Sequence, residues 1–523
     1  MLKSIAGLAV AAMLAATPAA ADEMERHHDH PAPERLGAVT FQTSCDPQTR
    51  APFNRAVALL HSFAYTLSKQ AFADVAEQDP HCAMAFWGEA MTHYHELWEP
   101  AVDSEDELRE GADEIRRAAL VGGAASPRER QYIEALGQYF LDWSHTAPGI
   151  RAQRYAAAMA EVAKTNSADD EAQIFYALSL IATASPFDKT HGNDKRAAEI
   201  LEPLWKHDPQ HPGIAHYLIH AYDSTELAQR GLAAARAYSK IAPSAPHALH
   251  MPSHIFTRLG LWQDSVVSNL AARAAARAQG DVGEELHAMD YLTYAYLQLG
   301  RNDDAARVVA AVRAMPNLPV AQFKVGYAAN AMRVRMAIET SDWDGAARLS
   351  ALPGSTPRVA AIVYWARALG HERASHASFS DADVASLAAC LGQLRAGGDT
   401  YWATETDALL KSALAWEMQR HGDSANAVAT LRAAADEEDG LEKLPVTPGP
   451  IIPAREQLGE LLLDQHRAAD ALHEFKTALA LAPGRRAAIL GAVAAAEETG
   501  DTEVANQLRT QLPGQVPARE AHD

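Results

Sequence analysis

The feature that most constrains this chain is the regular alternation of amphipathic helical segments with helix breakers. Between about Pro52 and Leu512, Ala-rich segments are separated by Pro, Gly, Asp or Asn, and strand patterns are nearly absent. Two such segments joined by a turn form a helical hairpin that buries only part of its apolar face, so successive hairpins must stack. The sequence therefore predicts an all-α solenoid along most of its 523 residues.

The clearest repeat unit lies near the C-terminus. Its small residues let two helices approach closely, Phe475 fills the space between them, and Pro483 stops the second helix. The spacing resembles the tetratricopeptide-repeat (TPR) signature, with a period of about 34 residues, at Leu458, Gly459, Leu462, Ala471, Phe475, Ala478 and Pro483. This resemblance implies a TPR-like helical-hairpin solenoid wound as a right-handed superhelix.

Longer phrases resemble those of exported bacterial TPR proteins. They lie at residues 60–63, 79–88, 211–223 and 246–256. The resemblance covers residues 40–310 and implies an extracytoplasmic repeat protein, but it carries no biochemical activity with it. Any function must therefore be argued from the side chains.

The first residues have the pattern of a secretory signal peptide. Lys3 is followed by an apolar run from Ile5 to Ala16 and by small residues up to Ala21. We therefore expect residues 1–21 to be removed near Ala21 and the mature protein to be periplasmic or secreted. The apolar run is too short to cross a bilayer and no later stretch is long enough, so no membrane span is expected.

Three further parts are expected after the signal peptide. Residues 22–40 form a disordered tail that contains histidines, residues 41–315 form an N-terminal TPR-like superhelix with a histidine-rich groove, and residues 316–523 form C-terminal TPR-like hairpins.

Charge and cysteine content restrict the partners and the cross-links. The formal net charge of -21, from 67 acidic and 46 basic residues, argues against nucleic acid as a partner. Only three cysteines are present. Cys45 and Cys82 are candidates for a disulfide, and the sequence leaves open whether they pair.

Histidines recur at fixed offsets from the turn glycines. We take the positions 13, 10, 6 and 3 residues before Gly260, the same positions before Gly300, and the first set moved back by one 34-residue repeat. Because neighbouring positions in a set are three or four residues apart, each set lies on one helix face. The twelve positions hold six histidines and two aspartates, where chance predicts roughly half a histidine. The three sets are His247, His250, His254 and Thr257; His287, Asp290, Tyr294 and Leu297; and Gly213, His216, His220 and Asp223.

In TPR folds the first helix of each hairpin lines the concave groove, and the resemblance places these positions there. Stacked hairpins lie about 10 Å apart, close enough for imidazoles of adjacent repeats to converge. His61 and His95, which are also 34 residues apart, are expected in the same groove. Because Pro252 is best tolerated in the first turn of a helix, we expect His247, and by extension His250, to lie in the preceding loop.

Imidazoles at this spacing beside carboxylates indicate a transition-metal site. Copper, zinc and iron all suit such donors, and a site with an open position can also act on a substrate, so catalysis is left open. The candidate ligands are His216, His220, His250, His254, His287 and Asp290. Additional ligands, or residues that orient the ligands, are His247, Asp223, His61 and His95.

Two other interpretations stay open. A TPR-like groove can bind a peptide or protein partner without metal, although neutral imidazole is a poor clamp at pH 7. The histidines can also be hydrogen-bonded core residues. The sequence has no phosphate-binding loop, nucleophile elbow or His-Glu-x-x-His motif.

Overall fold

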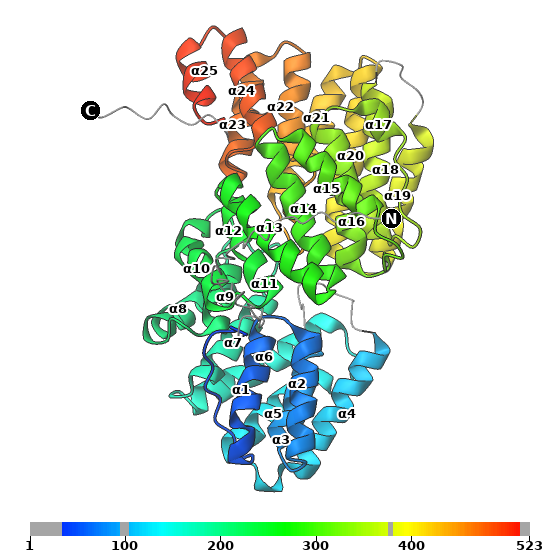
Figure 1. The fold of residues 1–523 in the computed structure, drawn as a ribbon. Helices are drawn as coiled ribbons and strands as arrows, with labels where there is room; N and C mark the ends of the chain where they lie inside the picture. The colour runs from blue at the N-terminus through cyan, green and yellow to red at the C-terminus, as the bar shows by residue number, and fades with distance from the viewer. Residues whose placement is uncertain (1–33, 95–103, 375–379, 513–523) are drawn as a thin grey trace, which may run out of the picture. The chain divides into compact units, whose positions relative to one another are not determined.

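A computed structural model describes residues 34–94, 104–374 and 380–512 of the chain. The predicted signal peptide, most of the predicted tail and His95 lie outside these ranges. The described residues from Arg35 onward form one compact unit, and the description below concerns this unit (Figure 1).

Every regular element in the described ranges is a helix. The first part contains the short 3-10 helices η1 (Pro47–Thr49) and η2 (Gly122–Ala124). Its α-helices are α1 (Arg50–His61), α2 (Tyr65–Gln78), α3 (Ala83–Met91), α4 (Glu105–Val121), α5 (Pro127–Phe140), α6 (Pro148–Thr165), α7 (Asp170–Ala182) and α8 (Gly192–His207).

The middle and the C-terminal parts continue in the same manner. The middle helices are α9 (Pro212–Ala221), α10 (Ala228–Ile241), α11 (Pro246–His250), α12 (Pro252–Arg258), α13 (Trp262–Gln279) and α14 (Val282–Gln298). The later helices are α15 (Asn302–Arg313), α16 (Phe323–Glu339), α17 (Trp343–Ala347), α18 (Pro357–Arg373), α19 (Asp381–Ala396), α20 (Thr400–Arg420), α21 (Ser424–Asp439), α22 (Ala454–Asp464), α23 (Ala468–Leu481), α24 (Arg486–Glu498) and α25 (Thr502–Arg509).

The helices pack as stacked hairpins. Helices adjacent in the chain contact each other, as α13 does with α14, and helices two apart also meet, as α14 does with α16 and α18 with α20. This nearest-neighbour packing is typical of a helical-repeat solenoid. The predicted all-α, TPR-like fold is therefore confirmed. None of the helices in the described ranges is long and apolar enough to cross a membrane.

The C-terminal repeat unit packs as its residue types predict. Phe475 is fully buried against Gly459, where an added Cβ would lie 2.8 Å from the Phe475 ring. A larger residue at position 459 would therefore push the two helices of this hairpin apart.

The predicted boundary at residue 315 falls between α15 and α16. Val312 and Val325, on its two sides, belong to one cluster of buried apolar side chains. The position of this boundary stays a prediction.

Distant repeats meet where α23 ends. The Thr225 hydroxyl donates to the carbonyl of Leu481 at 2.8 Å, and the Trp262 indole N–H donates to the carbonyl of Gly484 at 2.8 Å. Gly260 has a positive φ of 68°, and an added Cβ there would lie 2.6 Å from the carbonyl oxygen of Pro483. This turn glycine is thus required both by its backbone conformation and by the C-terminal repeat that packs on it.

The structure joins Cys45 to Cys82 by a disulfide, with 4.8 Å between the two Cα atoms. The bond connects the segment before α1 to the residue that caps the N-terminus of α3. Cys390 is a buried free thiol.

Candidate metal centre

Four helices bring the six register histidines together in the interior. They form two groups of three, and within each group one nitrogen from each histidine lies within 4.8 Å of the other two. The first histidine group consists of His216 and His220 from α9 with His247 from α11, and the second of His250 from α11, His254 from α12 and His287 from α14. All six side chains are buried.

The expectation that His247 and His250 lie in a loop is wrong. Both belong to α11, which begins at Pro246, and α12 begins directly at Pro252. Met251 between them has a helical backbone, with φ -52° and ψ -36°. The physical reason is that each proline sits in the first turn of its own short helix, where its missing N–H breaks no hydrogen bond.

In the second histidine group, hydrogen-bond partners determine where the protons lie. His254 Nδ1 is 2.8 Å from a carboxylate oxygen of Asp223, so this nitrogen must carry a hydrogen and donate it. His250 Nδ1 is 2.7 Å from the side-chain oxygen of Asn269. The Asn269 amide cannot be reversed, because its nitrogen donates to the carbonyl of Ser265 at 2.8 Å.

Both Nε2 atoms of this pair therefore present lone pairs, and they face each other at 3.1 Å. A hydrogen bond between them needs one imidazolium. Burial opposes that charge: it lowers the pKa of His254 to about 4, against the attraction of Asp223, and it holds the pKa of His250 well below its ordinary value, with His254 adding repulsion. Two neutral nitrogens facing each other are an arrangement that a cation between them stabilises.

The first histidine group has a similar arrangement. His216 Nδ1 donates to the carbonyl of His61 at 2.7 Å, and His247 Nδ1 donates to a carboxylate oxygen of Glu284 at 3.2 Å. The Nε2 atoms of these two residues are therefore acceptors. His216 Nε2 lies 3.1 Å from Nε2 of His220, and His247 Nε2 has no hydrogen-bond partner.

The carboxylates that hold these imidazoles are themselves paired with cations. Burial alone would raise the pKa of Asp223, but Lys443 at 2.7 Å and Arg258 at 2.9 Å hold it well below its ordinary value. Lys324, at 3.1 Å, likewise opposes burial at Glu284 and helps to hold its pKa low. Both carboxylates are thus ionised and fix the Nδ1–H tautomer, the orientation that suits metal binding through Nε2.

His61 lies next to these groups but in a different environment. Its Nε2–H donates to Glu171 at 3.0 Å, and it accepts the Tyr217 hydroxyl on Nδ1 at 2.9 Å. His211 donates to the other oxygen of Glu171 at 3.1 Å and caps α9 by accepting the N–H of Ile214. We call His61, Glu171 and His211 the capped group, because each of these imidazole nitrogens has a complementary partner.

Gly213, which belongs to the same register set as His216 and His220, leaves space for the imidazole of His61 in the capped group. An added Cβ on Gly213 would lie 2.6 Å from Nδ1 of His61. The imidazole of His61 therefore packs directly on the backbone of α9, one turn before His216.

The two aspartates of the register have different surroundings. Asp223 accepts the Nδ1–H of His254, and its role beside a metal ion stays a prediction. Asp290 lies outside both histidine groups: its carboxylate is fully buried and neither oxygen has a hydrogen-bond partner. Burial raises the pKa of Asp290 to about 7, although Arg335 opposes the shift. The sulfur residues nearest in sequence, Met251 and Met289, belong to clusters of buried apolar side chains, and the donors that define the two histidine groups are imidazole nitrogens.

A segment distant in sequence covers the histidine groups. We call residues 441–453, between α21 and α22, the closing segment. The Tyr291 hydroxyl is within hydrogen-bond distance of the carbonyls of Pro445 and Thr447, and the Arg335 guanidinium donates to those of Gly449, Pro450 and Ile451. The Tyr291 ring also stacks on that of His254, with 5.0 Å between centroids.

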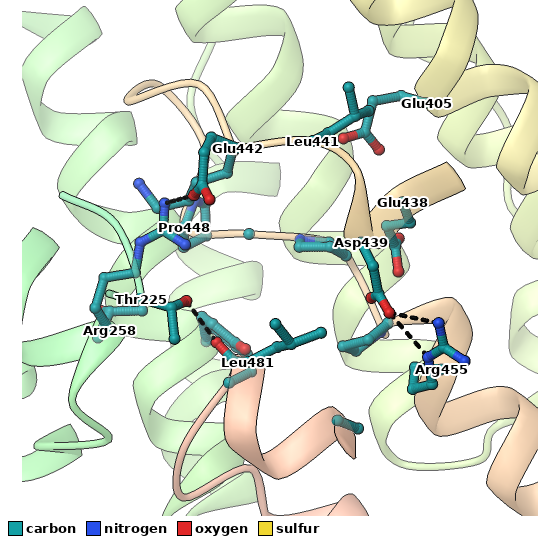
Figure 2. A pocket seen from close by; sticks show the side chains of 18 of the residues that line it. Thr225, Arg258, Glu405, Glu438, Asp439, Leu441, Glu442, Pro448, Arg455 and Leu481 are labelled. Atoms are coloured by element: carbon teal, nitrogen blue, oxygen red, sulfur yellow. Dashed lines mark hydrogen bonds and ion pairs between the residues drawn. The ribbon is translucent and has the colours of Figure 1, made fainter. Parts of the chain in front are cut away.

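Charged side chains attach the start of the closing segment. Lys443 reaches Asp223, and Glu442 pairs with Arg258 at 3.4 Å. Figure 2 shows this ion pair at the edge of a cavity that the closing segment forms with the turn at Leu481 and with Arg455, which is paired with Asp439. These partners were not predicted from the sequence.

A second cavity opens onto His220 of the first histidine group. It contains about 600 Å³ of empty space, part of it open to solvent, and it is also lined by Asp194, Asp223 and Lys443. Burial raises the pKa of Asp194 to about 7, with Glu442 adding to the shift. Through this cavity a small molecule can approach His220.

Comparisons with known proteins add little to this geometry. No protein-family model and no curated protein sequence matches the chain. Among solved structures, human IFIT1 dimers with m7Gppp-AAAA and with PPP-AAAA are 12% and 11% identical, with TM-scores of 0.34 and 0.35. Each alignment covers 81% of this chain and 88% of the other. The description of the fold therefore depends on the helices and contacts given above.

Proposed function

We propose that this protein binds a transition metal through the imidazoles of its two histidine groups. The observation that carries the proposal is the pair of neutral nitrogens on His250 and His254, which face each other at 3.1 Å while each Nδ1 is fixed as a donor. With metal–nitrogen bonds of about 2.0–2.1 Å, that separation corresponds to a ligand–metal–ligand angle of roughly 100°.

The donor set restricts the metal. Three imidazoles per group without a carboxylate oxygen suit copper, zinc or iron and do not suit magnesium or calcium. The fixed Nδ1–H tautomers lower the cost of organising the ligands when the ion binds. Three imidazoles also leave a coordination position for a small ligand, and the cavity at His220 gives access to it. Catalysis at this position is part of the proposal, with no substrate assigned.

The alternative is a metal-free scaffold that binds a peptide in its groove. Tyr291 and Arg335 do bind backbone carbonyl groups, but those carbonyls belong to the chain's own closing segment. A partner peptide would have to displace it here, so we favour the metal site. Under the alternative, a partner would remain bound in the presence of a chelator.

Metal content tests the proposal directly. The full chain, purified without an affinity tag, is exposed to copper, zinc and iron, desalted and measured by elemental analysis. We expect stoichiometric metal in the parent and its loss in the His216→Ala/His250→Ala double variant, which removes one ligand from each group. Absence of stoichiometric metal in the folded parent would overturn the proposal.

We also infer that the chain acts outside the cytoplasm, in the periplasm or as a secreted protein of the exported bacterial TPR type. The support is the signal-peptide pattern of residues 1–21 together with the disulfide between Cys45 and Cys82, a bond typical of oxidising compartments. Mass spectrometry of the protein from its natural cell tests this. We expect a mature chain that begins after Ala21, and retention of residues 1–21 would contradict it.

A further inference from the structure

The two histidine groups are continuous with each other. Across the groups, the rings of His220 and His254 have centroids 5.9 Å apart, and those of His247 and His250 are 6.1 Å apart. Two-metal sites hold their ions about 3.5–4 Å apart. Six imidazoles arranged as two neighbouring sets of three are more than one ion can use, because four-coordinate sites take at most four.

We propose that the two histidine groups hold a pair of copper ions, one in each group, and that dioxygen binds between them. This inference rests on the proposed metal-binding function and adds to it the number of ions, the metal and the ligand. The observations that carry it are the duplicated three-imidazole set, the contact between the sets and the charge of the surroundings.

The charge of the surroundings favours monovalent ions. The imidazole donors are neutral, and the carboxylates that touch them, Asp223 and Glu284, are already matched by Lys443, Arg258 and Lys324. Two divalent ions would therefore add four positive charges to a buried site, whereas two Cu(I) ions add two. Because repulsion between buried charges is strong at low dielectric, the reduced copper pair is the better fit.

Dioxygen keeps this charge constant when the copper is oxidised. Each Cu(I) gives one electron and becomes Cu(II), and O2 takes up the two electrons to become peroxide, which bridges the two ions. The ions gain two positive charges and the ligand brings two negative charges, with no proton transferred and no external oxidant other than O2. The cavity at His220 gives a molecule as small as O2 an approach to the first histidine group.

The first experiment counts the copper. The full chain without a tag is loaded with excess Cu(I) under anaerobic conditions, desalted and analysed. We expect two copper ions per chain. One ion per chain would overturn the pair but leave the proposed metal binding intact. No bound copper would overturn this inference, and the proposed function would be overturned only if zinc and iron also failed to bind.

The second experiment adds dioxygen to the copper-loaded protein. We expect an intense near-ultraviolet charge-transfer band and no electron paramagnetic resonance signal, because the spins of two bridged Cu(II) ions couple. A full signal from isolated Cu(II), or two copper ions that do not react with O2, would overturn the inference.

Group-specific variants locate the two ions. His216→Ala/His247→Ala and His250→Ala/His287→Ala are each expected to keep one copper and to show the isolated Cu(II) signal after oxidation. His145→Ala, which changes an exposed histidine paired with Asp142, should keep two ions and a silent spectrum. If a double variant fails to fold by circular dichroism, the copper count and the spectrum of the parent still decide the question. Two ions retained in both folded double variants would overturn the assignment.

Discussion

The capped group and the second histidine group consist of similar buried residues whose imidazole nitrogens are paired in different ways. His61 and His211 share Glu171, and every nitrogen described in that group has a partner of the opposite kind. His250 and His254 also have fixed Nδ1 partners, but their Nε2 atoms face each other as two acceptors. Burial and proximity of histidines are therefore not enough to indicate a metal site. The better indication is a set of imidazole nitrogens whose lone pairs have no hydrogen-bond donor.

The largest difference between the two groups should appear when the proposed metal is removed, because, of the two, only the second histidine group is expected to bind it. Binding to the native state alone stabilises it by about 4 kcal/mol at a free metal concentration 1,000 times Kd. We therefore expect thermal unfolding of the parent to shift to lower temperature when a chelator strips the ion. The His216→Ala/His250→Ala variant, which lacks one ligand of each histidine group, should show no such shift, and His145→Ala should behave like the parent. A shift that persists in the ligand variant would place the metal elsewhere.

A substitution in the capped group should lower the stability of the fold and leave the metal content unchanged. Glu171→Gln replaces one acceptor oxygen by an N–H donor and leaves one imidazole N–H without its partner. Loss of a buried, charge-assisted hydrogen bond costs about 1–3 kcal/mol, measurable by urea unfolding. Elemental analysis of the same variant should give the metal content of the parent. If Glu171→Gln lost its metal while folded, the capped group would belong to the metal site.

The same substitution at Glu284 provides the matched contrast. This carboxylate orients His247, a proposed ligand. Loss of such an orienting partner typically weakens metal affinity by about 10- to 100-fold. We expect Glu284→Gln to keep the number of bound ions and to bind them more weakly in a competition titration with a chromophoric chelator. Equal metal affinity in the parent and in Glu284→Gln would show that Glu284 does not help to orient His247 for metal binding.

The smallest expected effect is a change in pH dependence. His61 and His211 outweigh the burial that would otherwise raise the pKa of Glu171, so its pKa is held low in the folded protein. A carboxylate with a lowered pKa contributes stability above its unfolded value, about 4.3, and loses it as pH falls toward the folded value. Urea unfolding of the metal-free parent should therefore lose stability below about pH 4.3 more steeply than that of Glu171→Gln. Parallel pH curves would show that Glu171 carries no such stability.

The positions of the six histidines follow from the repeat period, and this explains why they were predictable. His216 and His220 lie one repeat before His250 and His254, and His287 continues the series from Gly300. A fixed period in a solenoid converts sequence distance into neighbouring places on one surface. The same reasoning placed Asp290 beside the proposed ligands, but its carboxylate belongs to neither histidine group, and Arg335 is the charged group that opposes the effect of burial on its pKa.

Other partners could not be predicted, because they come from chain segments far from the register. Glu171, Asn269 and Glu284 look like ordinary helix residues in the sequence, yet each decides which nitrogen of a histidine carries a proton. Lys443 reaches Asp223 from a loop 220 positions away. His95, predicted as an outlying ligand, lies outside the described residues and stays a prediction.

The sequence by itself determined the helical repeat, the face on which the histidines lie and their approximate convergence, because these depend on local periodicity. Only the tertiary structure decided the division into two groups of three, the separation of His61 into the capped group, and the covering by the closing segment. These depend on which donors and acceptors meet across 30 to 200 residues of chain or more, and hydrogen-bond complementarity at a buried site is a property of contacts that no local pattern encodes.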